Sequence, residues 1–132
     1  MINIYVVLGI LFTHWVADFL CQTHKMSIMK SKSNLWLSFH IIAYTGVFLT
    51  ACIIGDVVWF KSTNQWLFKT AEQAQIFVLI TFVAHWLTDY FTSRLNSKLW
   101  AENKVHWFFV SVGFDQFLHF TQLFLTYYYL TK

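Results

Sequence analysis

Four long stretches of the chain are almost continuously apolar, and short polar segments separate them. Each stretch approaches or exceeds the roughly 20 residues that a helix needs to cross a bilayer. Membrane β-strands are shorter and alternate in polarity, and a lone hairpin cannot satisfy its backbone in lipid. The pattern therefore predicts an all-α fold, an integral membrane four-helix bundle, with spans at residues 4–20, 35–60, 74–91 and 105–130.

The composition narrows the class of protein further. The chain has 132 residues, of which 58% are hydrophobic, 21% aromatic and 11% charged, and it contains no proline. Soluble domains carry about 25% charged residues, so this chain is too poor in charge for a typical soluble domain. Disordered chains are poor in hydrophobic residues, so disorder is excluded. Two cysteines without a CxxC pattern exclude a disulfide scaffold. Nine dispersed Lys and Arg against six Asp and Glu argue against a nucleic-acid partner. We expect one transmembrane domain, residues 1–132, in contact with membrane lipid.

The basic residues predict an orientation in the membrane. Loops 21–34 and 92–104 carry six Lys or Arg, whereas Lys61, Lys69 and Lys132 are the three basic residues expected on the other side. Basic loops stay in the cytoplasm. We therefore expect the inner (cytoplasmic) membrane, with loops 21–34 and 92–104 cytoplasmic and both termini outside. The first span lacks a basic leader and a cleavage motif, so it is expected to be retained as an anchor.

One short pattern occurs twice. Residues 14–18 read His-Trp-Val-Ala-Asp, and residues 85–89, 71 positions later, read His-Trp-Leu-Thr-Asp. At the same offset Trp36 corresponds to Trp107. Two repeated helical hairpins would produce this pattern and would bring the first and third spans together. Chance similarity is the alternative, because few positions are identical.

Each predicted span carries polar residues at helical spacing. Residues i and i+4 share one face of an α-helix, so these side chains form narrow stripes on otherwise apolar cylinders. Charged groups within a span are costly and normally face the bundle interior or a wet cavity. We expect the stripes to converge on one chamber that faces the cytoplasm. Their members are His14, Asp18 and Gln22; His40 and Tyr44; Thr81, His85, Asp89 and Thr92; and Ser111, Asp115, His119 and Gln122.

The residue types in these stripes suit a metal centre. An HxxxD pair on a helix brings an imidazole and a carboxylate to one cation, and borderline metals such as zinc favour these donors. Three ionised aspartates in a low-dielectric bundle also need compensating charge. We expect one or two divalent transition-metal ions, with zinc favoured. The predicted metal ligands are His14, Asp18, His40, His85, Asp89, Asp115 and His119.

Such a centre favours a membrane-embedded metal-dependent hydrolase. A divalent metal lowers the pKa of bound water towards ~7, and the resulting hydroxide can attack a phosphoester in a lipid or another amphiphilic substrate. Asp18, Asp89 and Asp115 are the candidate catalytic residues, and Gln22, Lys25 and Tyr44 the candidate substrate-binding residues.

A non-enzymatic function remains open. The protein would then conduct ions or protons, or act as a phage-type interaction module, with the stripes as a polar path or as contacts between helices. A homo-oligomer is a further hypothesis, because four short spans form a small scaffold, although no clear small-xxx-small motif specifies one.

These residues also carry a resemblance to a known family. The run His14-Trp-Val-Ala-Asp18-Phe-Leu-Cys-Gln22, a Lys-containing loop, and then His40 and Tyr44 resemble the domain-of-unknown-function 3307 family. Its HxxxDFxxQ pattern is followed by a later HxxxD and by an Asp/His helix, which match residues 85–89 and 115–119. The resemblance implies a small bacterial or phage membrane protein without an established activity.

A more distant likeness is to membrane-bound metal-dependent hydrolases and zinc phospholipase C-type helical proteins. That likeness implies HxxxD helices around a metal cluster. The chain lacks the N-terminal ligand and the full ligand count of those phospholipases. One or two metals are therefore expected rather than three.

Overall fold

The computed structural model describes residues 3–132, which contain helices and no strand. The prediction of an all-α fold is thereby confirmed. The chain begins with α1 (Ile4–Trp15), which continues without a break into the π-helical turn η1 (Val16–Leu20). The remaining helices are α2 (His24–Met29), α3 (Asn34–Thr63), α4 (Ala71–Ala101) and α5 (Val105–Thr131).

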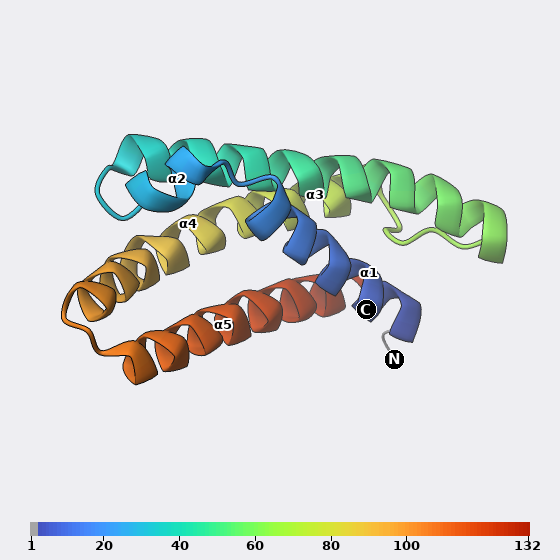
Figure 1. The fold of residues 1–132 in the computed structure, drawn as a ribbon. Helices are drawn as coiled ribbons and strands as arrows, with labels where there is room; N and C mark the ends of the chain where they lie inside the picture. Colours follow the sequence, from blue (N-terminus) through green and yellow to red (C-terminus); the bar gives the residue numbers. More distant parts are fainter. Residues whose placement is uncertain (1–2) are drawn as a thin grey trace.

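Three long helices form the body of the molecule. α4 packs against both α3 and α5, and α1 crosses the group in contact with α3 and α5 (Figure 1). Both ends of the chain and the α3–α4 connection lie at one end, which we call the terminal end (Figure 1). α2 and the α4–α5 turn lie at the other, which we call the loop end (Figure 1). The two basic loops are therefore at the same end of the fold.

Local sequence signals account for several helix boundaries. The side chains of Asn3, Thr23 and Thr70 accept hydrogen bonds from the first turns of α1, α2 and α4. Such caps satisfy backbone N–H groups that lack an intrahelical partner. Asn64 caps the end of α3 and Asn103 lies in the α4–α5 turn, with φ of 57° and 55°. Asparagine tolerates this left-handed conformation better than most residues.

Two predicted loops are more helical than the hydropathy indicated. α4 continues to Ala101, so most of the predicted loop 92–104 belongs to this helix. The predicted loop 21–34 contains α2. Hydropathy marks where a segment stops being apolar, whereas a helix ends where its backbone hydrogen bonds end. The last turns of α4 are polar, so this helix ends ten residues after its apolar segment does.

The molecule is polar inside and apolar outside. Nearly half of the buried residues within the described chain are polar or charged. Large apolar side chains are exposed along α1 and along the three long helices, among them Phe12, Ile53, Leu79 and Phe117. By length and composition, α3 and α4 could each cross a membrane. The first apolar helix, at residues 4–20, is shorter than those two. The prediction of four spans in a bundle stays a prediction.

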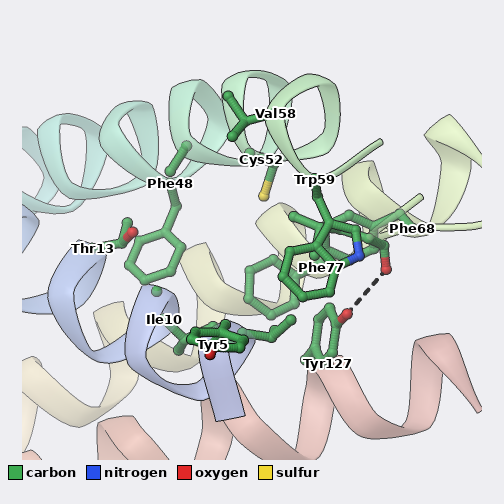
Figure 2. A pocket seen from close by; sticks show the side chains of 15 residues that line it. Tyr5, Ile10, Thr13, Phe48, Cys52, Val58, Trp59, Phe68, Phe77 and Tyr127 are labelled. Carbon is green, nitrogen blue, oxygen red and sulfur yellow. Dashed lines mark hydrogen bonds between the residues drawn. The ribbon is translucent and has the colours of Figure 1, made fainter. Parts of the chain in front are cut away.

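An apolar core fills the terminal end. It includes Phe48, Phe68, Phe77 and Leu123 and adjoins a cavity of about 250 Å³ (Figure 2). Polar contacts hold the α3–α4 connection over this core. The Asp56 Oδ1 atom accepts hydrogen bonds from the backbone N–H groups of residues 67 and 68, at 2.7 and 3.2 Å. The Tyr127 hydroxyl donates to the carbonyl oxygen of residue 67 at 3.1 Å (Figure 2).

Replacing Asp56 should test how this connection is held. Asp56→Ala leaves two backbone donors without their acceptor, so we expect a loss of about 1–3 kcal/mol in unfolding free energy. Asp56→Asn keeps a side-chain oxygen and should lose less. Thermal unfolding in detergent measures both. Glu102→Ala, on the exposed α4–α5 turn, is the control, since surface ion pairs contribute about 0–1 kcal/mol. Equal melting temperatures for Asp56→Ala and Glu102→Ala would contradict this role.

Candidate metal centre

Polar side chains from all the crossing helices meet inside the bundle. α1 and η1 supply His14 and Asp18, and α3 supplies His40. α4 supplies His85 and Asp89, and α5 supplies Asp115 and His119. All seven side chains are buried. The structure therefore gathers every predicted metal ligand into one cluster, which we call the His/Asp cluster.

One part of the cluster has the geometry of a four-ligand site. Asp18, His40, His85 and Asp89 each offer one ligand atom, and these four atoms lie within 4.8 Å of one another. The Nε2 atom of His40 is 3.1 Å from Asp18 Oδ1 and 3.3 Å from Asp89 Oδ2. The Nε2 atom of His85 is 3.7 Å from Asp18 Oδ1 and from Asp89 Oδ1. Tetrahedral ligands bound at 2.0–2.1 Å would be about 3.3 Å apart, which is close to these separations.

A second group shares one residue with the first. Asp89, Asp115 and His119 also offer ligand atoms within 4.8 Å of one another. The Nε2 atom of His119 lies 3.2 Å from Asp89 Oδ1 and 3.3 Å from Asp115 Oδ1. Asp89 thus belongs to both groups: its Oδ2 atom faces His40, and its Oδ1 atom faces His85 and His119. This arrangement could hold either one or two ions.

Unpaired polar atoms support the fit to a cation. Along residues 3–132, the buried atoms without a hydrogen-bond partner include both ring nitrogens of His85, Asp18 Oδ1 and His119 Nδ1. His40 approaches Asp18 Oδ1 closely, but the contact lacks hydrogen-bond geometry. Buried polar atoms nearly always have partners, so unmet donors and acceptors in a cluster need an explanation. A divalent metal would satisfy these atoms, since imidazole nitrogens and carboxylate oxygens are typical ligands.

The charges in the cluster lead to the same conclusion. The Lys30 ammonium is 2.7 Å from Asp89 Oδ2 and 3.5 Å from the Nε2 atom of His40. Burial opposes the charge of this lysine, but the carboxylates of Asp89 and Asp18 outweigh burial and raise its pKa. One lysine cannot balance three buried aspartates. A bound cation would supply the missing positive charge.

The π-helical turn η1 positions Asp18. The N–H of residue 21 donates to the carbonyl oxygen of Val16 at 2.9 Å, five residues back. Asp18 Oδ2 remains 3.8 Å from the Nε2 atom of His14, while Oδ1 faces His40 and His85. Single π turns inside α-helices often occur at functional sites. The sequence indicated a regular α-helix here and missed this turn.

His14 lies beside the ligand groups, in contact with two neighbouring side chains. Its Nδ1 is 2.7 Å from the Tyr44 hydroxyl, and its Nε2 is 2.9 Å from Gln116 Oε1. The Gln116 amide also donates to Asp18 Oδ2 at 3.3 Å and to Asp115 Oδ2 at 3.1 Å. With both nitrogens engaged, His14 has none directed at a cation here. Its assignment as a ligand stays a prediction.

The sequence did not reveal the contacts that three further residues make with the cluster. Gln116 holds two aspartates, and the Thr92 hydroxyl donates to Asp115 Oδ1 at 2.6 Å. Thr92 belongs to the predicted stripe on its helix, so spacing had marked its face but not its partner. In the sequence, Lys30 is one of several basic residues in a predicted loop, and no pattern distinguishes it from the others. Its contact with Asp89, 59 residues away, depends on how the loop folds back.

The three predicted substrate-binding residues lie in different surroundings. Gln22 Nε2 is 3.1 Å from the Nδ1 atom of His40, so Gln22 borders the cluster. Tyr44 is fully buried against His14. The Lys25 ammonium lies 4.7 Å from the centre of the Trp36 ring, on the exposed side of α2. Their role in substrate binding stays a prediction.

A cleft leads from the loop end to the His/Asp cluster. It has a volume of about 800 Å³, and Asp18 and Asp115 form part of its wall. We call this cleft the vestibule. It lies between α2 and the α4–α5 pair, and its volume falls within the usual range for ligand pockets. The cavity at the terminal end, by contrast, is bordered by residues outside the predicted site (Figure 2).

Comparison with known proteins gives one match. The family model described as "Protein of unknown function (DUF3307)" matches residues 6–132. No curated protein and no solved structure matches the chain.

Asp89 belongs to both ligand groups, so its replacement should change the metal content more than replacement of Asp115. If two ions bind, Asp89→Asn should remove both, whereas Asp115→Asn should remove only the ion of the second group. Elemental analysis of protein purified without a histidine tag measures the stoichiometry. Asp56→Asn, a carboxylate outside the cluster, should keep the full content. Full metal content in Asp89→Asn would rule out the arrangement described here.

Proposed function

The chain belongs to the DUF3307 family, whose function is unknown, and we propose that it is a membrane-embedded, metal-dependent hydrolase of a phosphoester in a lipid or similar amphiphile. The observation that carries this proposal is Asp89, whose carboxylate is common to two buried groups of metal-ligand type. Zinc is the favoured metal, because the donors are histidine nitrogens and carboxylate oxygens.

The cluster has the parts that metal-assisted hydrolysis requires. A bound divalent metal would act as a Lewis acid on a phosphoryl oxygen and would activate water as a nucleophile. Asp18 and Asp89 would hold it together with three histidines, His40, His85 and His119. Gln116 would fix the two outer aspartates. Water would add to phosphorus and the ester P–O bond would break, giving an alcohol and a phosphate. The vestibule gives a substrate a route to Asp18 and Asp115.

Membrane insertion is supported by the apolar exterior. Exposed apolar side chains this numerous are rare on soluble monomers, and α3 and α4 have the length and hydropathy of membrane helices. The loop end carries six of the nine basic residues. We therefore place the loop end, and the mouth of the vestibule, on the cytoplasmic side of the inner membrane, with both termini outside.

The two non-enzymatic alternatives fit the interior less well. Side chains that only joined helices would pair with one another, yet His85 has no hydrogen-bond partner within residues 3–132. An ion or proton path would need to continue past the cluster. On the terminal side of the cluster the Gln122 amide donates hydrogen bonds to Thr81 and Thr126. Packed apolar residues surround these side chains, including Phe48, Phe77 and Leu123. A site open at one end suits a hydrolase better than a conductor.

Hydrolysis should require both the metal and the aspartates. We expect the metal-loaded protein in detergent to release alcohol from phosphoester substrates, and chelation to abolish this activity. Asp18→Asn should lower the rate by at least about 10–100-fold, the cost of losing even a residue that supports a metal ligand, because the charge that holds the cation is lost. Asp56→Asn is the matched control and should retain the rate. Absence of hydrolysis across soluble and lipid phosphoesters by fully loaded protein would exclude the proposal.

The orientation can be tested by labelling single cysteines in intact cells. In a chain with Cys21 and Cys52 replaced, an impermeant maleimide should label Lys69→Cys, at the terminal end. Lys98→Cys, near the end of α4 at the loop end, should be labelled only after lysis. The opposite result would reverse the orientation. Release of the protein from membranes by alkaline carbonate would contradict insertion.

A further inference from the structure

The polar stripe of α4 continues beyond the His/Asp cluster into the vestibule. Ser93 and Asn96 follow Asp89 by about one and two turns and form part of the vestibule wall. In the described part of the chain, Ser93 Oγ and Asn96 Oδ1 are both buried without a hydrogen-bond partner. A serine hydroxyl can donate a hydrogen bond, and an asparagine amide can present either its oxygen or its NH2 group. Two such groups left unpaired on one helix face indicate that a polar ligand belongs there.

The charges around the vestibule favour an anion once metal is bound. The basic side chains on its wall are Lys30 and Lys32, and the acidic ones are Asp18 and Asp115. These two aspartates belong to the proposed metal centre, so bound cations would neutralise them. The vestibule then keeps two positive side chains, Lys30 beside Asp89 and Lys32.

Apolar side chains also line the vestibule. They are Phe19 of η1 and Trp100, Phe108 and Phe109 near the α4–α5 turn. Phe19 and Phe109 are 52% and 63% exposed, so this part of the lining reaches the apolar outer surface of the molecule. A ligand in the vestibule can therefore contact both polar groups and hydrocarbon.

We propose that the vestibule binds the phosphate group of an amphiphile, with the phosphate near Lys30, Lys32, Ser93 and Asn96. The hydrocarbon part lies against Phe19 and Phe109 and continues into the surrounding apolar phase. This inference rests on the proposed function and names the residues that bind its substrate. The neighbouring position of Asp18 and Asp115 places the phosphate next to the metal ligands, and a volume of about 800 Å³ accommodates a head group and the first part of its chains.

Three probes distinguish a lipid phosphate from free phosphate and from a neutral lipid as the ligand. Isothermal titration of metal-loaded protein in detergent would use dihexanoyl phosphatidate, inorganic phosphate and dihexanoylglycerol. We expect phosphatidate to bind most tightly and inorganic phosphate more weakly. The neutral diacylglycerol should give only the signal of partition into micelles. Equal affinity for phosphate and phosphatidate would overturn the amphiphile assignment and leave a site for free phosphate.

Substitutions in the vestibule test its location. The double variant Lys32→Gln/Asn96→Leu should weaken phosphatidate binding by about 10-fold or more, because charge-assisted hydrogen bonds are lost. Its metal content should be unchanged, since neither side chain contacts the cluster's ligands. Lys98→Gln is the matched control, because this α4 lysine is 73% exposed outside the vestibule. Unchanged affinity in the double variant, or an equal loss in Lys98→Gln, would overturn the proposal.

The same measurements test phosphatidate binding in the vestibule independently of hydrolysis. Metal and hydrolysis in the wild type, with no effect of the double variant on phosphatidate binding, would contradict only the vestibule. Phosphatidate binding that depends on Lys32 and Asn96, in protein that neither retains metal nor hydrolyses esters, would contradict the hydrolase. The vestibule would then be a lipid-binding site rather than a substrate site.

Discussion

Three buried aspartates impose the constraint on which the rest of the structure depends. A carboxylate removed from water is strongly penalised unless positive charge or hydrogen-bond donors surround it. Asp18, Asp89 and Asp115 receive the Lys30 ammonium, the Gln116 amide and the Thr92 hydroxyl as partners. These contacts come from the α2–α3 loop, α5 and α4, so segments far apart in sequence must meet at one point. Even so, the charges do not balance, and this imbalance is the physical basis of the proposed metal centre.

The arrangement of the helices closes the site on the terminal side and leaves it accessible from the loop side. α1 crosses the three long helices and ends in the π turn, which points Asp18 towards His40 and His85. On the terminal side, Phe48, Phe77 and Leu123 pack into an apolar core, and Asp56 fastens the α3–α4 connection over it. On the loop side, the vestibule reaches the cluster. Electrostatic interactions are stronger in such a water-poor interior, which suits stabilisation of charge in a transition state.

The spacing of polar residues anticipated the faces of the helices well. His85 and Asp89, and Asp115 and His119, lie one turn apart and both pairs enter the cluster, as an α-helix of 3.6 residues per turn requires. His14 and Asp18 also lie one turn apart in the cluster, although the π turn that contains Asp18 was not indicated by the sequence. Hydropathy located the apolar segments but placed the end of α4 ten residues too early, since polar residues can continue a helix.

By itself, the sequence determined the helical class, the inward polar faces and the residues able to ligate a metal, because these follow from short-range periodicity and side-chain chemistry. Only the tertiary structure decided that Asp89 is shared by two groups, that Lys30 rather than Lys25 reaches the cluster, and that His14 pairs with Tyr44 and Gln116. These contacts join residues 30 to 102 positions apart. Their geometry depends on how the helices cross, which no local pattern specifies.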